Sequence, residues 1–547
     1  MRVHYPRTSH LPWSPGASSD DVRTTDLSGL AGREVVVTEK LDGENTTLYA
    51  DGLHARSLDS AHHPSRAWVK SLQGLVGPSI PAGWRVCGEN LYARHSLAYH
   101  DLDSWFSAFS VWDGDFCLDW DATVRFCADR GLPTPPVLWR GVFDEKALRG
   151  LRLDLTRQEG FVVRAVAGFT RDEFSARVAK WVRRGHVQTD QHWMQAPVVV
   201  NGRGAAAALW DVRAGFPVDV PALLAAVDMR STNDLTRLDL LGRTGDARLA
   251  GVLATLLHAC PRPRVMARLA RLGLPLARRV ADLVGLHPLL YRDFPDEARR
   301  AGLTRLAMAT DLGVLHAVAA AVGDTQAVEW SRMHAEEAGL LGPDPWRPLR
   351  DALTDLAPGD VRDRCFAEAR TALADGRLHS PEEVPAATWR WRAGDFPRLI
   401  VLVGPAGSGK STFVTGQEVD DVVSMDALRD SGDQRANPAV LREALGRLDR
   451  ALARGGTVVW DATALNRHQR STVATVAAGR NALVTHAVVV VEEEEAARRN
   501  AARSHPVPPA VLSAQFARFV PPYPGEAHRT WYVGAAGTVE DVDDAHE

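Results

Sequence analysis

Hydrophobic and polar residues alternate in short runs over the first 200 residues of the chain. Runs such as "EVVVTEKLDGENTTLY", "WFSAFSVWDG" and "EGFVVRAV" are rich in Val, Phe, Trp and Tyr and are bounded by Gly and Asp. β-Branched and aromatic residues in runs of this length are typical of strands. The pattern predicts a mixed, largely antiparallel sheet domain over residues 1–200.

A different pattern covers residues 205–385. In "DARLAGVLATLLHAC" and "RLAMATDLGVLHAVAAAV" the apolar residues recur every three or four positions, and arginines occupy the other face. This period matches the turn of an α-helix. Because strand signals are almost absent here, the pattern predicts an all-α middle domain.

A proline-containing linker, "LHSPEEVPAATWRWRAGDFP", leads into a third pattern over residues 396–547. An apolar strand, a glycine loop and a helix start follow each other in "RLIVLVGPAGSGKST", and "GTVVWDATALN" and "LVTHAVVVVEE" read as further buried strands. Buried strands that alternate with helices are typical of parallel sheets. The chain is therefore predicted to be a multidomain α/β and α+β protein.

Composition sets only broad limits. The chain has 547 residues with 45% hydrophobic and 24% charged content, which is the balance of a globular protein with roughly three to four domains. No apolar run is long enough to cross a bilayer, and the start lacks the apolar core of a signal peptide. We therefore expect a cytoplasmic protein without a membrane partner.

Net charge is −4, which does not exclude an enzyme that handles nucleic acid in a local groove. The five cysteines are scattered and predict neither a disulfide framework nor a zinc site.

Lysine is rare in this chain, and its positions are informative. Of 64 basic residues only five are lysines, which leaves 59 arginines (64 − 5). The five are Lys40, Lys70, Lys146, Lys180 and Lys410. An arginine stays protonated, whereas a lysine whose pKa falls can attack phosphorus as a free amine. Lys40, in "EKLDGEN", is a candidate nucleophile on these grounds, and a solvated lysine at a hairpin turn is the alternative.

"GPAGSGKS" matches the complete phosphate-binding loop pattern G-x-x-x-x-G-K-[ST]. Gly404 and Gly409 let backbone N–H groups face a triphosphate, Lys410 reaches the outer phosphates and Ser411 ligates magnesium. A strand precedes the loop and a helix follows it, as the motif requires. The sequence therefore predicts a nucleotide site here.

Downstream segments supply polar side chains that suit phosphoryl transfer. Asp426 and Arg429 share one face of a helical turn, where they are either a base with a phosphate-binding arginine or a surface ion pair. Asp461 ends a buried strand and suits either a magnesium-associated acid or a helix cap. Arg499 and Arg503 share one helical face, which either closes over the transferring phosphate or is solvated.

In this order, the segments over roughly residues 396–535 resemble the polynucleotide 5′-kinase family. Its kinase domains carry a phosphate loop, S-x-D-x-x-R, D-A-T, and a lid of R-N-x-x-R followed by V-P. The resemblance implies that Asp426 is the general base on a 5′-hydroxyl, that Arg429 contacts the acceptor phosphate, and that Arg499 and Arg503 grip the donor. Thr412 joins the implied nucleotide-binding set. The usual Asn after D-A-T is Ala464 here.

The first 195 residues resemble the covalent nucleotidyltransferases, and within them the RNA ligase branch. "EKLDGEN", "HARSLD", "CGENLYARHSL", "FSAFSVWD", "EGFVVR" and "VAKWV" follow the family order. The opening "HLPWSPG" and the segments "HHPSRAWVK" and "HVQTDQHWM" also resemble the RNA ligase branch. The resemblance implies that Lys40 carries AMP, that Glu89 holds the ribose, that Phe109 stacks on adenine and that Glu159 binds a metal ion. The implied binding set also contains Glu39, Arg56 and Lys180. The usual second lysine of the last motif is Val182, so either Lys180 acts alone or Arg183 shares its task.

The helical stretch resembles HD-type phosphohydrolase domains, but His258-Ala259-Cys260 stands where the family has its His-Asp ligands. A helical scaffold without a working metal site, of which a degenerate HD fold is one form, is therefore expected, and an active phosphatase is the alternative. The basic stretch from Arg262 to Arg279 either contacts an RNA backbone or is a solvated helix face.

Together the resemblances imply an RNA repair enzyme with three domains: an RNA ligase nucleotidyltransferase domain at 1–200, a helical domain at 205–385 and a P-loop kinase domain at 396–547. Its expected partners are ATP, Mg²⁺ or Mn²⁺, and RNA with broken ends, tRNA being one candidate. The helical residues that follow position 200 favour an RNA ligase over a DNA ligase or a capping-type nucleotidyltransferase, which remain alternatives. A nucleotide-regulated RNA-binding protein without catalysis is another.

Overall fold

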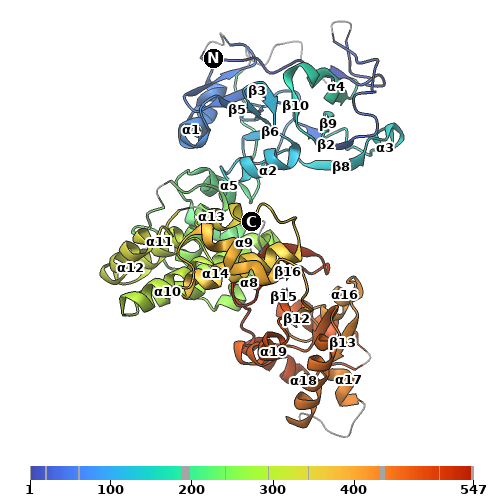
Figure 1. Cartoon of the computed structure of the whole chain (residues 1–547). Coiled ribbons are helices and arrows are strands. Elements are labelled where there is room, and N and C mark those ends of the chain that lie inside the picture. Colours follow the sequence, from blue (N-terminus) through green and yellow to red (C-terminus); the bar gives the residue numbers. More distant parts are fainter. Residues whose placement is uncertain are drawn as a thin grey trace. The chain divides into compact units, whose positions relative to one another are not determined.

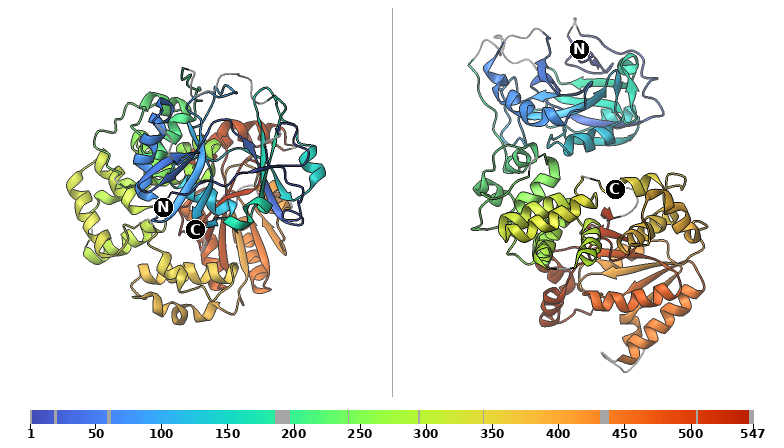
Figure 2. Two further views of the ribbon diagram at one scale, coloured as in Figure 1. Left: turned by 90° about the horizontal axis from the view of Figure 1, so that it is seen from above. Right: turned by 60° about the vertical axis from the view of Figure 1, so that its left-hand side comes forward.

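The computed structural model describes residues 2–18, 21–58, 62–185, 197–240, 242–293, 295–342, 344–430, 438–503 and 505–543, without the side chains at 429 and 430. The RNA-ligase-like segment "HVQTDQHWM" lies outside these residues. Contacts divide the chain into two compact units, residues 1–230 with 241–249, and residues 231–240 with 250–547. Figure 1 labels the elements, and Figure 2 shows two further views.

Two sheets form the first unit. The five-stranded sheet has the order β1-β11-β9-β2-β8, and the six-stranded sheet has the order β10-β7-β6-β5-β3-β4. Apart from the short parallel pair β1–β11, the strand pairs are antiparallel. The strands are β1 (Ser9–His10), β2 (Glu34–Lys40), β3 (Glu44–Tyr49), β4 (Gly52–Ala55), β5 (Trp84–Asn90), β6 (Phe106–Asp113), β7 (Phe116–Cys117), β8 (Val137–Val142), β9 (Gly160–Ala165), β10 (Phe169–Thr170) and β11 (Val178–Val182). The helices are α1 (Ala67–Val76), α2 (Trp120–Ala128), α3 (Glu145–Arg149), α4 (Phe174–Arg177), α5 (Ala207–Ala214) and α6 (Val220–Ala226).

The middle of the chain is helical, as its periodicity predicts. Its helices are α7 (Gly245–Leu257), α8 (Arg262–Leu269), α9 (Leu274–Leu286), α10 (Asp296–Ala307), α11 (Leu312–Val322), α12 (Thr325–Glu337), α13 (Arg347–Asp351), α14 (Asp360–Ala374) and α15 (Val384–Thr388). Figures 1 and 2 show α10, α11 and α12 packed side by side. Within the described residues no single helix could span a membrane by length and composition. The pair α10 and α11 passes that test only together, with a bend of 109°.

A six-stranded sheet of order β13-β14-β12-β15-β16-β17 forms the rest of the second unit. All neighbours are parallel except β16 and β17, which are antiparallel. Its elements are β12 (Arg398–Val403), α16 (Lys410–Thr415), β13 (Asp421–Ser424), α17 (Met425–Asp430), α18 (Pro438–Ala453), β14 (Thr457–Asp461), α19 (Arg467–Gly479), β15 (Leu483–Val489), α20 (Glu493–Ala501), α21 (Pro509–Arg518), β16 (Arg529–Val533) and β17 (Val539–Asp543). The predicted fold class, with antiparallel and parallel sheets and a helical middle, is confirmed.

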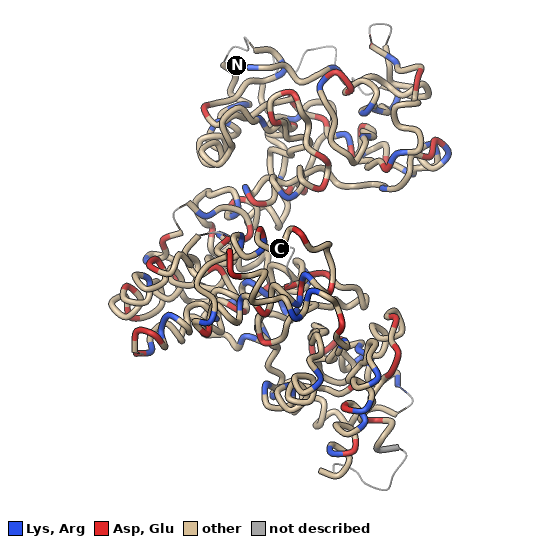
Figure 3. Tube along the Cα trace, in the orientation of Figure 1, with Lys and Arg blue, Asp and Glu red and all other residues tan. Residues whose placement is uncertain are grey.

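Charged residues of both signs are interspersed along the chain, as Figure 3 shows. Two arginines of the basic stretch contradict both readings of that stretch. Arg262 and Arg278 are 7% and 5% exposed, so they face neither solvent nor RNA. The sequence interpretation fails for them because each also bonds to a group that is distant in sequence: Arg262 donates to the Pro521 carbonyl and Arg278 donates to Asp541.

Candidate active sites

A cavity of about 1090 Å³ lies in the first unit, and strands of both sheets line it. All seven residues that the sequence places in this site reach its wall: Glu39, Lys40, Arg56, Glu89, Phe109, Glu159 and Lys180. The apolar run of β2 explains the position of Lys40. Val35, Val36 and Val37 are fully buried, and Lys40 ends the strand where the chain turns toward β3. The core therefore fixes the strand, while its last side chain faces the cavity.

Lys40 and Glu159 form an ion pair at the cavity wall. The antiparallel register places Lys40 opposite Gly160, the residue after Glu159, and Lys40 Nζ donates to Glu159 Oε2. Burial lowers the pKa of Lys40, but the charges of Glu159, Glu89 and Asp42 outweigh burial and raise it. A nucleophilic lysine needs a lower pKa, so the structure holds Lys40 in its protonated form.

Three other predicted residues of the cavity have shifted pKa values. Burial raises the pKa of Glu89 to about 8, although Lys40 opposes the shift, and Glu89 Oε1 accepts from the backbone N–H of Gly43 at 3.2 Å. Burial and the nearby Lys40 charge lower the pKa of Lys180. Burial also raises the pKa of Glu39, whose carboxylate accepts from Gln158 at 2.9 Å.

The raised pKa of Lys40 predicts that transfer of AMP to the protein accelerates with pH. The ammonium form cannot attack, so the reactive fraction grows up to about tenfold per pH unit below the pKa. Single-turnover labelling with α-labelled ATP between about pH 6.5 and 9 measures this rate. Sealing of RNA that is already adenylylated needs no free Lys40 amine and serves as the control. A labelling rate that is flat or falls with pH contradicts the assignment.

Sequence reasoning missed an N-terminal segment that lines the same cavity. His4, Tyr5, Pro6, Arg7, Thr8 and His10 reach the wall. The backbone N–H of Val3 donates to Tyr49 Oη at 3.0 Å, and β1 pairs with β11 beside Lys180, so the segment connects the two sheets. The Tyr5 ring packs edge-on against Phe109, with 5.1 Å between centroids. Apart from the aromatic and basic composition of "HYPRTSH", no sequence signal marks it.

A second cavity, of about 1290 Å³, surrounds the phosphate loop. Eight predicted residues line it: Gly409, Lys410, Ser411, Thr412, Asp426, Asp461, Arg499 and Arg503. Gly404 begins the loop, and its N–H donates to Thr463 O at 3.0 Å. Arg429 lies in α17, and its side chain is outside the described residues.

The loop conformation requires glycine. Gly407 has a φ of +73°, and a Cβ there would lie 2.4 Å from Ala496 O. Lys410 Nζ donates to the Gly404 and Pro405 carbonyls at 2.9 and 2.7 Å. Burial lowers the pKa of Lys410 to about 8. The backbone carbonyls thus hold the lysine over the loop, where a phosphate can compete for it.

Ser411, Asp426 and Asp461 bring oxygen donors to the wall of the same cavity as Lys410. β13 and β14 pair Ser424 with Asp461, and burial raises the pKa of Asp461. Asp426 follows in the first turn of α17. A hydroxyl and carboxylates are the donors that Mg²⁺ prefers, so Ser411 and Asp461 fit the predicted metal.

Arg499 and Arg503 do not share one helical face, so the sequence prediction for these two lid arginines is wrong. α20 ends at Ala501, so Arg503 lies beyond the helix, because Pro506 and Pro508 follow and a helix cannot continue into them. Arg499 Nη1 donates to Ser408 O at 3.4 Å and its Nη2 to Ala535 O at 3.1 Å. Sequence reasoning missed Gln515, whose Oε1 accepts from the loop N–H of Ala406 at 2.7 Å.

The backbone conformation of Ala464 predicts that its replacement by glycine stabilises the protein. It is buried, and its φ of +42° is in the left-handed region that disfavours a Cβ. Ala464→Gly is expected to raise the free energy of unfolding by up to about 1 kcal/mol, because the relief of strain exceeds the entropy cost of glycine. Denaturant unfolding measures the change. Ala462→Gly, at a position without positive φ, should destabilise, and equal effects at both positions would contradict the strain argument.

Within the described residues, no group of three or more His, Cys, Asp or Glu side chains is arranged to hold a metal ion. In the helical region His258 Nδ1 lies 3.2 Å from the side-chain amide of Asn233, and its ring packs edge-on against that of His287 at 6.0 Å.

Residues 33–182 match the family model of the RNA ligases, and residues 399–522 match a family model described as an AAA domain. No curated protein matches the chain. Among solved structures the chain is similar to the Pnkp1/Rnl/Hen1 RNA repair complex, with 23% identity over 22% of this chain and 44% of that chain, and a TM-score of 0.21. It is similar to a gluconokinase from Sinorhizobium meliloti 1021, with 25% identity over 26% and 84% and a TM-score of 0.20. It is also similar to the Naegleria gruberi RNA ligase with PPi, with 18% identity over 33% and 61% and a TM-score of 0.22.

Proposed function

We propose that this chain, which carries an RNA ligase domain and a P-loop kinase-like domain, phosphorylates 5′-hydroxyl RNA ends and seals them to 3′-hydroxyl ends. One observation carries the proposal: the chain holds two separate cavities, one around the Lys40–Glu159 pair and the other around the phosphate loop. The two reactions are consecutive on one substrate, because the product of phosphorylation is the 5′-phosphate that ligation needs.

In the kinase site, the Asp426 carboxylate takes the proton of the RNA 5′-hydroxyl. The oxygen attacks the γ-phosphorus of ATP, the bond to the β-phosphate oxygen breaks and ADP leaves. Lys410, Arg499 and Arg503 stabilise the negative charge on the transferring group. A magnesium or manganese ion, held by Ser411 and Asp461, would supply further positive charge beside the phosphates.

In the ligase site, Lys40 first gives up its proton to water and then attacks the α-phosphorus of ATP. A nitrogen–phosphorus bond forms and pyrophosphate leaves. The 5′-phosphate of the RNA next displaces Lys40 from the AMP. Finally the 3′-hydroxyl attacks the activated 5′-phosphate, so that a phosphodiester forms and AMP leaves. Phe109 stacks on the adenine and Glu89 binds the ribose. Lys180 and Arg56 hold the phosphates, and Glu39 lines the same cavity.

The test uses a broken RNA with 5′-hydroxyl and 3′-hydroxyl ends, ATP and Mg²⁺. The expected product is a sealed strand, formed through a 5′-phosphorylated species. DNA of the same sequence and GTP in place of ATP are the comparisons. Sealing of nicked DNA alone would favour a DNA ligase, self-labelling with GTP a capping enzyme, and no protein–AMP at all a nucleotide-regulated binding protein.

A further inference from the structure

We propose that the helical region positions the donor-binding arginine of the kinase site through the hairpin formed by β16 and β17. This inference rests on the proposed kinase function and assigns a task to the helices. It makes Asp541, which lies outside both cavities, a positioning residue for Arg499.

The tip of the hairpin holds Arg499. Ala535 lies in the turn between β16 and β17, and its carbonyl accepts from Arg499 Nη2 at 3.1 Å. The turn is closed by two backbone hydrogen bonds, Gly534 N–H to Thr538 O at 3.0 Å and Gly537 N–H to Gly534 O at 2.9 Å. The same side chain donates through Nε to Glu495 Oε1 at 2.6 Å and through Nη1 to Ser408 O of the phosphate loop at 3.4 Å. Glu495 lies on the same helix as Arg499, so the Ala535 carbonyl is the contact through which the turn acts on the position of the guanidinium over the phosphate loop.

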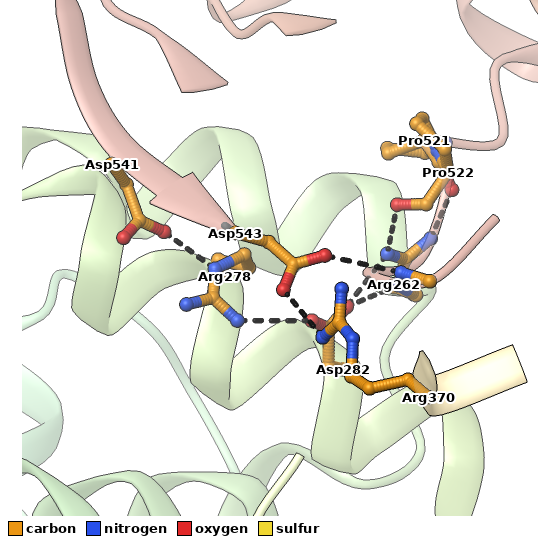
Figure 4. A network of polar contacts seen from close by, with 9 residues as sticks. Arg262, Arg278, Asp282, Arg370, Pro521, Pro522, Asp541 and Asp543 are labelled. Atoms are coloured by element: carbon orange, nitrogen blue, oxygen red, sulfur yellow. Dashed lines mark hydrogen bonds and ion pairs between the residues drawn. The ribbon is translucent and has the colours of Figure 1, made fainter. Parts of the chain in front are cut away.

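The base of the hairpin is anchored in the helical region. Arg278 of α9 donates to Asp541 Oδ2 at 2.5 Å, and Arg370 of α14 donates to Asp543 Oδ1 at 3.1 Å. Both carboxylates point from β17 toward these arginines in Figure 4. All four side chains are at most 7% exposed, and each pair is a charge-assisted hydrogen bond in a medium of low dielectric.

A third arginine connects the anchor to the rest of the unit. Arg262 of α8 donates to Asp282 at 2.6 Å and to the Pro521 carbonyl at 2.5 Å, and Asp282 lies 3.8 Å from Arg278. Three arginines therefore face three carboxylates, so the buried charges balance. Breaking one pair leaves an uncompensated buried charge, which the structure relieves by moving β17. Movement of β17 shifts the Ala535 turn and with it Arg499.

The experiment measures KM for ATP and kcat for phosphorylation of 5′-hydroxyl RNA in Asp541→Asn. KM for ATP is expected to rise by roughly two- to thirtyfold. A merely structural defect reduces the folded fraction, which lowers apparent kcat and leaves KM unchanged. The matched control is Asp375→Asn, which removes an aspartate that pairs with Arg305 at 2.7 Å and does not touch the hairpin. In an Arg499→Ala background, Asp541→Asn should cause no further rise in KM.

Gly537→Ala covers the case in which Asp541→Asn does not fold. Gly537 has a φ of +81°, and a Cβ there meets only Thr412 Cγ2, at 3.6 Å, so the substitution strains the turn without touching the buried charges. It should raise KM for ATP in the same way, and this rise should disappear in an Arg499→Ala background, because an effect transmitted through Thr412 of the nucleotide site would persist there. An unchanged KM in both variants, or an effect that persists in Arg499→Ala, overturns the inference.

Hydrogen exchange separates this inference from the proposed function. In the protein without RNA, amides of α20 should exchange faster in Asp541→Asn than in the parent or in Asp375→Asn. If the parent phosphorylates no RNA yet α20 shows this change, the kinase proposal is wrong and the coupling stands. If the parent is active but α20 and KM do not change, the coupling is wrong.

Discussion

Lys40→Ala is expected to lower the rates of protein–AMP formation and of sealing of 5′-phosphorylated RNA by at least about a thousandfold. The reason is that the residue that bonds to the α-phosphorus is gone. Phosphorylation of 5′-hydroxyl ends should continue at the parental rate, since Lys40 belongs to the cavity of the first unit. Labelled ATP followed by denaturing electrophoresis measures the adduct, and end-labelled RNA measures both RNA reactions.

Two further variants sharpen this test. Lys40→Arg keeps the positive charge beside Glu159 but cannot supply a free amine, so it should be as inactive as Lys40→Ala. Lys70→Ala removes an exposed lysine of α1 and should behave like the parent. If Lys40→Arg formed the adduct, the nucleophile would be another residue, and Lys40 would serve only as a charge.

Lys410→Ala is expected to have the converse effect. Loss of the lysine that lies over the phosphate loop should slow 5′-phosphorylation by roughly a hundredfold to ten-thousandfold, because a charge that stabilises the transferring phosphate is absent. RNA that already carries a 5′-phosphate should still be sealed. A rate of phosphate transfer from γ-labelled ATP to 5′-hydroxyl RNA measures the loss.

The control for this variant is Lys146→Ala, an exposed lysine in α3. Mixing Lys40→Ala with Lys410→Ala should restore the complete reaction, since each protein keeps the site that the other lacks. If Lys410→Ala phosphorylated RNA as fast as the parent, the phosphate loop would not be the donor site. If it lost sealing as well, the two cavities would not be separate sites.

Local patterns were enough to predict the parts of both sites that depend on neighbours in sequence. The apolar run of β2 and the turn after Lys40 place that lysine at a strand end, and the glycines of "GPAGSGKS" predict the loop that the structure has, with positive φ at Gly404, Gly407 and Gly409. The positions of Glu89 and Glu159 came only from the resemblance, yet the antiparallel register brings Glu159 to Lys40.

Properties that depend on distant parts of the chain could not be predicted. The pKa of Lys40 rises because Glu89 and Glu159 lie near it together with the neighbouring Asp42, and spacing along the chain does not show that these two glutamates are close to Lys40. Tyr5 reaches Phe109 from more than a hundred positions away. Arg278 looks like a solvated arginine on a basic helix, and only the packing of β17 shows that it is internal.

The anchor between β17 and the helices also bears on how the chain is made. Arg278 leaves the ribosome 263 residues before its partner Asp541, and Arg370 leaves it 173 residues before Asp543. During that interval the two guanidinium groups cannot be buried without a large desolvation cost. The helices therefore complete their packing only once β17 has emerged, and nascent chains that stop short of β17 keep these guanidinium groups in water and expose an incompletely packed surface to chaperones and proteases.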